Sequence, residues 1–276
     1  MAEQAGSVAS LAFPGSRSGE TPLARALTTP QGRIGARILL VAILLLAWEF
    51  APVGKGTGFW LSKPSLVAGT IWQWILDGTL RVHLQATLAV MAEGYVTGCL
   101  AGIGIGIVLG LVPRLHRVVS PFLAGFYAMP KIALAPLFII LLGVGDLSKV
   151  ALVAITVFFL VVTNTIEGVR DVDRDLVRSL TLMGATRVEV IRKVVVRSAL
   201  PWIFTGMRIA VRYAFTNTLL AELIAANRGL GFLIEFNSGN FNITGAYAGI
   251  AVLVLCSVLL TELLSRLEAR VSRWRG

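Results

Sequence analysis

Long apolar runs, separated by short polar segments, dominate the chain from residue 36 onward. Several runs approach or exceed the ~20 residues with which an α-helix crosses ~30 Å of hydrocarbon, and the weaker ~10-residue alternation of a membrane β-barrel is not seen. The pattern therefore predicts an all-α integral membrane protein. Six transmembrane helices are expected, at residues 36–53, 85–111, 118–142, 149–166, 202–224 and 246–267.

Two segments outside these spans have patterns of their own. Residues 1–33 are rich in Ala, Gly, Ser, Thr and Pro and lack apolar periodicity, so we expect a disordered cytoplasmic tail before a membrane domain at 34–276. Between the first two spans, Lys63-Pro64-Ser65 can begin a helix with one apolar side that ends at Asp77-Gly78. This helix either lies on the outer membrane surface, which would favour its Trp72, or is an ordinary connector.

The second span contains a glycine at every fourth position over five turns. Such spacing leaves one side of the helix without side chains, which lets another helix approach closely in lipid. A G-x-G pattern in the same stretch lies inside a span rather than at a strand-to-helix turn, so it does not indicate a dinucleotide site. We therefore predict tight helix packing along Gly94, Gly98, Gly102, Gly106 and Gly110.

One long, highly charged segment, residues 167–201, lies between the fourth and fifth predicted spans. Asp173 can cap a first helix whose apolar residues share one face, and Gly184 can end that helix in a left-handed conformation. Thr186 and Glu189 have the spacing of a capping box, which predicts a second short helix. The sequence thus predicts two helices with a sharp corner at Gly184-Ala185, in water.

Composition agrees with a membrane protein, and the distribution of charge predicts its orientation. Of the 276 residues, 56% are hydrophobic and 14% are charged, with a mean hydropathy of +0.79, whereas about a quarter of a soluble domain is charged. The net charge of +10 does not indicate nucleic-acid binding, because most Lys and Arg residues lie where a cytoplasmic amino terminus places them inside. We therefore expect both termini in the cytoplasm. The basic residues of the predicted outer loops are Lys55, Lys63, Arg81, Lys149 and Arg228.

Ionisable residues within the spans indicate a path for solute. A charge near the bilayer centre costs about 3 kcal/mol on insertion scales, so such residues should face protein or a wet cavity. Lys131 lies between Pro130 and Pro136, where a kink would free backbone groups to line a cavity. The cations fit a transient anion path, although internal neutralisation by Glu93 is an alternative. The candidate path residues are Lys131, Arg212, Glu93, Arg208 and Glu222, of which Arg208 and Arg212 share one helix side.

No set of residues predicts chemistry performed by this chain. None of its lysines has the G-x-x-x-x-G-K-[ST] context that cradles phosphates. His83 and His116 stand alone near span ends, which suggests interfacial residues. Cys99 and Cys256 fall inside spans, which suggests core packing rather than a disulfide or zinc site. We therefore expect no catalytic residue, no metal ligand and no cofactor bound by this chain.

Several phrases of the sequence resemble a known family. Residues 184–187 (Gly-Ala-Thr-Arg), 199–203 (Ala-Leu-Pro-Trp-Ile) and 206–208 (Gly-Met-Arg) are similar to the cytoplasmic signature of binding-protein-dependent ABC importer permeases, in the nitrate/sulfonate/taurine branch. Similar phrases stand at 63–65, 130–137, 143–146, 168–172 and 229–231, so the resemblance covers most of the chain. Where the family pattern has Glu-Ala-Ala before the glycine, this chain has Arg178-Ser179-Leu180, so a glutamate contact at 178 is not implied.

The resemblance implies an assembly and a role for the charged segment. It implies a homodimer in the bacterial inner membrane, two ATP-binding subunits that hold ATP and Mg, and a periplasmic solute-binding protein. Segment 167–201 would be the coupling loop that docks in a groove of the ATPase subunit. The implied coupling residues are Asp175, Arg178, Met183, Gly184, Ala185, Thr186, Arg187, Glu189 and Ile191.

The resemblance and the intramembrane cations together predict import of a small organic or inorganic anion of the sulfonate, taurine or nitrate type. Similar permeases import neutral or cationic heterocycles such as vitamin precursors, and this alternative stays open. An ion-coupled secondary transporter is disfavoured, because the spans show no obvious repeat and few acidic residues for a proton relay. A membrane-bound enzyme would need a nucleophile, metal or cofactor set. No nucleic-acid partner is expected.

Overall fold

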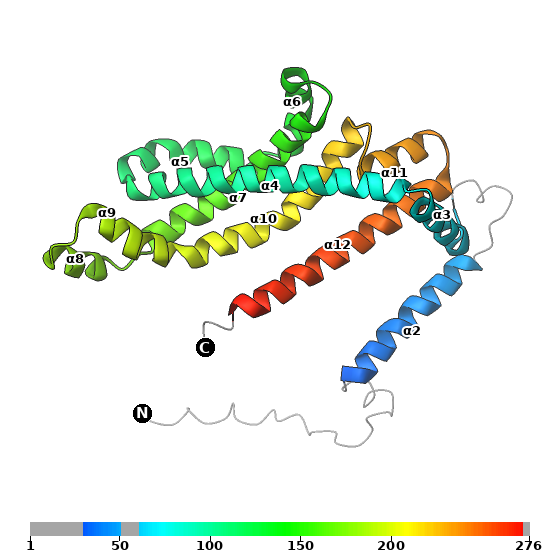
Figure 1. Ribbon diagram of the computed structural model, residues 1–276, viewed down its shortest axis with the longest axis horizontal. Helices are drawn as coiled ribbons and strands as arrows, with labels where there is room; N and C mark the ends of the chain where they lie inside the picture. Colours follow the sequence, from blue (N-terminus) through cyan, green and yellow to red (C-terminus); the bar gives the residue numbers. More distant parts are fainter. Residues whose placement is uncertain (1–29, 51–60, 273–276) are drawn as a thin grey trace, which may run out of the picture. The chain divides into compact units, whose positions relative to one another are not determined.

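The computed structural model describes residues 30–50 and 61–272, and all regular elements in these ranges are helices (Figure 1). The chain divides into two units, residues 1–54 and 55–276. In the first unit, α2 (Pro30–Glu49) covers most of the first predicted span. Residues 1–29 of the predicted tail and 51–53 of that span lie outside the described residues.

The second unit contains the other helices. Within the described residues, four helices are long and apolar enough to cross a membrane, or five if one bent pair counts as a single span. The number of six spans therefore remains a prediction. In chain order the elements are α3 (Pro64–Leu76), α4 (Thr79–Leu111), α5 (Pro113–Ala128), η1 (Lys131–Leu134), α6 (Ala135–Leu142), α7 (Asp146–Arg170), α8 (Arg174–Leu182), α9 (Arg187–Val190), η2 (Ile191–Val195), α10 (Val196–Ile224), α11 (Leu230–Gly239) and α12 (Ile243–Ser272).

Helix α7 is the centre of the second unit, with α4 and α10 packed against it (Figure 1). Val153, Val157 and Val161 of α7 are fully buried, and Ala210 and Ala214 of α10 pack with them in the largest apolar core. Small residues on α10 and glycines on α4 bring these helices close to the branched side chains of α7. Cys99 is buried in the same core and Cys256 packs against it, as predicted.

The glycine ridge of α4 is confirmed as the surface that contacts α7. A Cβ atom added at Gly98 would lie 2.5 Å from the carbonyl oxygen of Ala154 and 2.7 Å from Cβ of Val157. Comparable overlaps, at 2.5 to 2.9 Å, would occur at the other four ridge glycines. By contrast, a Cβ at Gly104 of the same helix meets nothing within 4 Å. The spacing of four therefore marks the face on which α7 leaves no room for a side chain.

The helix predicted between the first two spans is present as α3. Pro64 occupies its first turn, where the missing N–H costs no helix hydrogen bond, and Asp77 follows its last residue. Val67 is buried, whereas Trp72 is exposed. The helix packs against α12 and α4 within this unit, so its apolar side is at least partly covered by its own chain.

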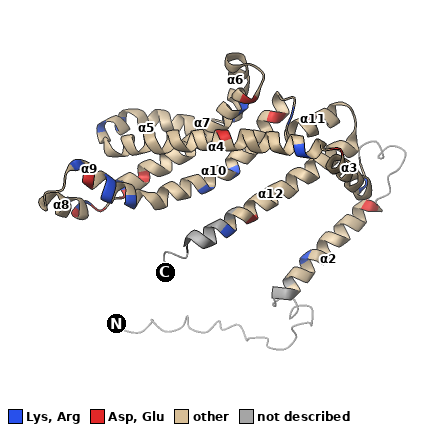
Figure 2. Ribbon diagram, in the orientation of Figure 1, with Lys and Arg blue, Asp and Glu red and all other residues tan. Residues whose placement is uncertain are grey.

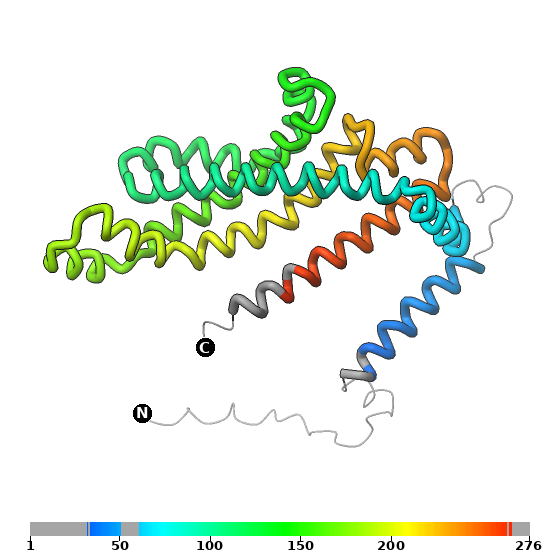
Figure 3. The backbone as a smooth tube through the Cα atoms, in the orientation of Figure 1, coloured from blue at the N-terminus to red at the C-terminus, as the bar shows by residue number. Residues whose placement is uncertain are grey.

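The third predicted span, 118–142, is not one straight helix. Helix α5 ends at Ala128, and the chain then turns and continues as η1 and α6 at 93° to α5 (Figure 3). Met129, which precedes Pro130, is extended, as the clash with a following proline ring requires. The predicted kink is thus a complete break, and Lys131 is the first residue after it.

The second short helix predicted in the charged segment is not a separate element. Helix α9 has only four residues and continues through the π-helical turn η2 into α10, so that one helical segment runs from Arg187 to Ile224. The prediction of a separate helix was wrong because no glycine or proline interrupts residues 187–200, and Pro201 is accommodated inside α10.

Candidate functional site

The corner at Gly184 ends α8 with two backbone hydrogen bonds that close its last turn. Gly184 has φ +87°, a left-handed conformation that favours glycine. Its N–H donates to the carbonyl of Thr181 at 3.1 Å, and the N–H of Ala185 donates to that of Leu180 at 3.0 Å. These two bonds are the Schellman pattern, which satisfies carbonyls that the helix end leaves open. At the other end of α8, Asp173 accepts from the N–H of Asp175, as predicted.

Immediately after the corner, the capping box predicted at Thr186 is present. The N–H of Thr186 donates to Oε2 of Glu189 at 3.0 Å, and the N–H of Glu189 donates to Oγ1 of Thr186 at 3.3 Å. Lys193 forms an ion pair with the same carboxylate at 3.0 Å. Residues 173–190, here named the elbow, therefore have a defined shape that local hydrogen bonds set.

The elbow carries exposed apolar side chains at its tip and is anchored at its base. Leu182 is 89% exposed, Met183 82% and Val188 73%, which is unusual for a segment rich in charged residues (Figure 2). At the base, the indole N–H of Trp202 donates to Asp171 at 3.1 Å, and Val169, Val195, Ala199 and Ile203 form an apolar core. A force on the tip would therefore reach α7 and α10 directly.

Two cavities share Tyr127 in their walls. The first, of about 300 Å³, lies between α5 and α7 and includes His116 and Glu167. The second, of about 280 Å³, lies beside the break after α5 and includes Lys131. Their wall on α7 is one helix face, because its residues are spaced by three or four. These α7 residues are Thr156, Leu160, Thr163, Ile166 and Glu167.

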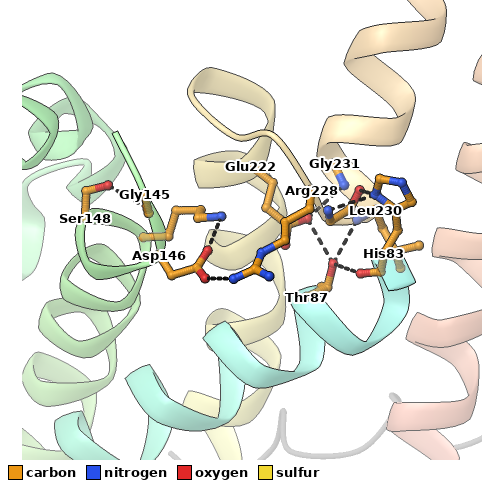
Figure 4. Close-up of polar contacts among 11 residues, drawn as sticks. His83, Thr87, Gly145, Asp146, Ser148, Glu222, Arg228, Leu230 and Gly231 are labelled. Carbon is orange, nitrogen blue, oxygen red and sulfur yellow. Dashed lines mark hydrogen bonds and ion pairs between the residues drawn. The ribbon is translucent and has the colours of Figure 1, made fainter. Parts of the chain in front are cut away.

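At the end of the bundle near α11, Glu222 joins three elements (Figure 4). The side chain is buried, and its Oε2 accepts from Oγ1 of Thr87 at 3.0 Å and from the N–H of Gly231 at 2.8 Å. Thr87 in turn accepts from the N–H of Leu230 at 2.8 Å, and His83 accepts from the N–H of Gly229 at 3.1 Å. Side chains of α4 and α10 thus satisfy the first N–H groups of α11.

A second polar cluster lies nearby at the start of α7 (Figure 4). Asp146 forms ion pairs with Lys149, at 2.7 Å, and with Arg228. Lys149 is only 3% exposed, although the sequence suggested an outer loop position. The pair with Arg228 connects the first residue of α7 to the segment between α10 and α11.

The chain matches a known protein family. Residues 102–273, more than half of the chain, match the family described as "Binding-protein-dependent transport system inner membrane component". The chain belongs to this family. It is therefore the permease subunit of an ABC importer, a transport subunit.

The permease has curated relatives over most of its length. It is 32% identical over 261 residues to the taurine transport system permease protein TauC of Escherichia coli (strain K12), covering 92% of both chains. It is 33% identical over 235 residues to the riboflavin transport system permease protein RibX of Chloroflexus aurantiacus, covering 85% of the permease and 88% of RibX. Its fold is similar to a chain of the inward-facing MetNI methionine ABC transporter, with a TM-score of 0.60, 20% identity, and coverage of 72% and 96%.

The coupling residues predicted for the permease lie together. Asp175 to Glu189 of that set belong to the elbow, and Ile191 is the first residue of η2. Arg178 pairs with Asp175 of its own helix at 3.2 Å, with both side chains exposed. Arg178 therefore stays exposed to solvent.

The predicted path residues are not brought together in one place. Lys131 lines the second cavity, while Glu93 and Arg212 are exposed and Arg208 is half-buried. Glu222 is held in the polar network near α11, which favours a structural function for it. Among the described residues, no ion pair joins Glu93 to Lys131 or to Arg212, so the alternative of internal neutralisation gains no support within one chain.

Sequence reasoning missed most of the neutral residues of the permease's second cavity. Thr156, Tyr213 and Asn217 line it together with Lys131. One signal was available, because Thr156, Thr163 and Glu167 lie at helical spacing on one side of a largely apolar segment. No pattern in the sequence predicted that Tyr127 and Tyr213 would line this cavity, because their positions in its wall depend on the break after α5.

We expect Glu222→Ala to destabilise the permease by about 1–3 kcal/mol, because the substitution leaves the buried N–H of Gly231 without an acceptor. Glu222→Gln should retain most of the stability, since one amide oxygen can accept both hydrogen bonds. Thermal unfolding of the purified permease in detergent measures the difference. Glu262→Ala, which removes an exposed pair with Arg266, is the matched control and should change little. An alanine variant as stable as wild type would contradict the structural function of Glu222.

Proposed function

We propose that two copies of this permease form an import path through the bacterial inner membrane, driven by two ATP-binding subunits and supplied by a periplasmic solute-binding protein. The observation that carries the proposal is the elbow, a doubly capped corner with an exposed apolar tip. Exposed apolar groups of this size on a charged segment mark a surface for another protein. The ATP-binding subunit is the partner that ABC importers require for energy.

The exposed charges within the membrane support a second copy. Glu93 and Arg212 lie in helices that are long and apolar enough to span the bilayer, yet both are exposed on the single chain. Charged side chains at such positions face protein or a wet cavity, because contact with lipid costs about 3 kcal/mol on insertion scales. A dimer with a central path would cover both residues without any change in the fold.

The proposed cargo is a small organic anion of the sulfonate class. The relative TauC belongs to a taurine transport system. In this permease, Lys131 and Arg212 are cationic groups within the spans that would attract a sulfonate. The relative RibX belongs to a riboflavin transport system, which keeps a neutral heterocycle as the second candidate. The small second cavity favours the anion over a ring system of that size.

The proposed mechanism is alternating access. Closure of the ATP-binding subunits would displace the two elbows, and each elbow would move α10 because residues 187–224 form one helical segment. The base contacts of Trp202 and Val169 would carry α7 with it. The path would then open outward to receive solute from the binding protein, which would determine most of the selectivity.

Purification of a tagged permease from native membranes tests the assembly. We expect an ATP-binding subunit to copurify in equal amount with the permease, and the complex to hydrolyse ATP faster when the loaded binding protein is added. In liposomes the complex should accumulate taurine or ethanesulfonate only with ATP. Isolation of the permease alone, with ATP-independent uptake coupled to an ion gradient, would instead support a secondary transporter.

A further inference from the structure

Lys131 occupies a position that the break between α5 and α6 creates. The residue follows Pro130 directly, at the point where the chain changes direction by 93°. In an unbroken helix over residues 118–142, Lys131 would be an ordinary residue in the middle of the helix. In the bent chain, Lys131 instead lines a cavity together with side chains of α7 and α10.

The contacts of the Lys131 ammonium group with the described residues are with neutral groups. Its Nζ donates a hydrogen bond to the carbonyl oxygen of Tyr127 and lies 5.2 Å from the ring centre of Tyr127 and 5.9 Å from that of Phe159. Aromatic faces attract a cation without neutralising it. Within the part of the chain that the structure describes, no carboxylate forms an ion pair with Lys131. An ammonium group has three donors, so this one retains capacity for an anionic ligand.

The rest of the cavity wall is mostly apolar, and two of its polar side chains, Thr156 and Asn217, are held by hydrogen bonds within their own helices. Thr156 donates to the carbonyl of Leu152 at 2.9 Å, and Asn217 donates to that of Tyr213 at 2.9 Å, and both side chains are buried. Tyr213 is half-exposed. The volume, about 280 Å³, lies at or below the lower end of the range of about 300–1,000 Å³ that is typical of pockets for drug-sized ligands. The cavity is therefore suited to a small solute with one anionic group.

We infer that the ammonium group of Lys131 binds the sulfonate or carboxylate group of the cargo during transit, in the cavity that Thr156, Tyr213 and Asn217 complete. This inference rests on the proposed function and adds a named contact to it. The cavity reaches Tyr127, which also lines the first cavity, so cargo released from Lys131 would next meet the face of α7 that carries Thr163 and Glu167.

The test uses the complete transporter in liposomes, with taurine and ethanesulfonate as probes. Lys131→Met keeps the length of the side chain and removes its charge, and we expect initial uptake of both probes to fall by about tenfold or more. Lys131→Arg, which keeps the charge, should stay within about threefold of wild type. Lys63→Met, the same substitution at an exposed residue before α3, is the matched control and should not change uptake.

A chemical rescue separates loss of charge from loss of fold. In a Lys131→Cys variant, modification with an aminoethyl thiosulfonate restores a cation, whereas a methyl thiosulfonate does not, and only the former should restore uptake. Uptake of the anions by Lys131→Met at the wild-type rate would overturn this inference while leaving the proposed function intact. Failure of the wild-type complex to take up either anion, with uptake of riboflavin instead, would overturn the proposed cargo and the inference with it.

Discussion

Replacing Gly98 by leucine should prevent the permease from folding into a stable bundle. A Cβ atom at this position would lie 2.5 Å from the carbonyl oxygen of Ala154 and 2.7 Å from Cβ of Val157, before any further leucine atom is placed. The backbone of α7 cannot yield as a flexible side chain would, so α4 and α7 must separate. We expect a loss of about 3 kcal/mol or more, at the upper end of overpacking costs. Thermal unfolding and size-exclusion chromatography in detergent measure the effect.

Gly104 provides the matched control for Gly98. It lies in the same helix, is exposed, and a Cβ atom there meets nothing within 4 Å. Gly104→Leu should therefore leave the unfolding temperature and the elution volume unchanged, although both substitutions add the same apolar side chain. Equal behaviour of the two variants, in either direction, would mean that contact with α7 does not decide the stability of α4.

The contrast between these glycines shows which parts of the fold the sequence can predict. Spacing of four along one helix identifies a face, and the caps at Asp173, Gly184 and Thr186 depend on residues only a few positions apart. Such local patterns were predicted correctly. The helix of residues 64–76 followed from the same kind of signal, namely a proline at its start and Asp77 at its end.

Features that depend on contacts distant in the sequence were not predicted. Glu222 was predicted as a path residue, and no local pattern indicated that Thr87, which lies 135 residues away, and the backbone of Gly231 donate hydrogen bonds to it. Asp146, the partner of buried Lys149, also pairs with Arg228, which lies 82 residues away, and no local pattern indicated that contact. For the candidate path, the sequence identified Lys131 but could not predict the direction of the chain after Pro130, which determines the neutral residues around it.

Replacing both Leu182 and Met183 by glutamate should abolish ATP-driven transport without unfolding the permease. Both side chains are more than 80% exposed, so their loss removes few contacts within the chain, whereas charge at the elbow tip would oppose burial in a groove of the ATP-binding subunit. We expect binding-protein-stimulated ATP hydrolysis to fall to the basal rate and the association to weaken by about 100-fold, as for two central interface residues.

The controls for the elbow separate contact from shape. Leu182→Met with Met183→Leu keeps the tip apolar and should retain transport.

Gly184→Val leaves the tip unchanged but puts a branched residue at φ +87°. No neighbouring atom lies within 4 Å of the added Cβ, so the effect of this substitution comes from backbone strain at the corner rather than from a clash. We expect this variant to fold and to lose coupling, because the Schellman bonds that aim the tip depend on the glycine conformation. Full coupling in Gly184→Val would show that the corner need not be rigid. Copurification and transport by the double glutamate variant at wild-type levels would show that the elbow tip is not the docking surface.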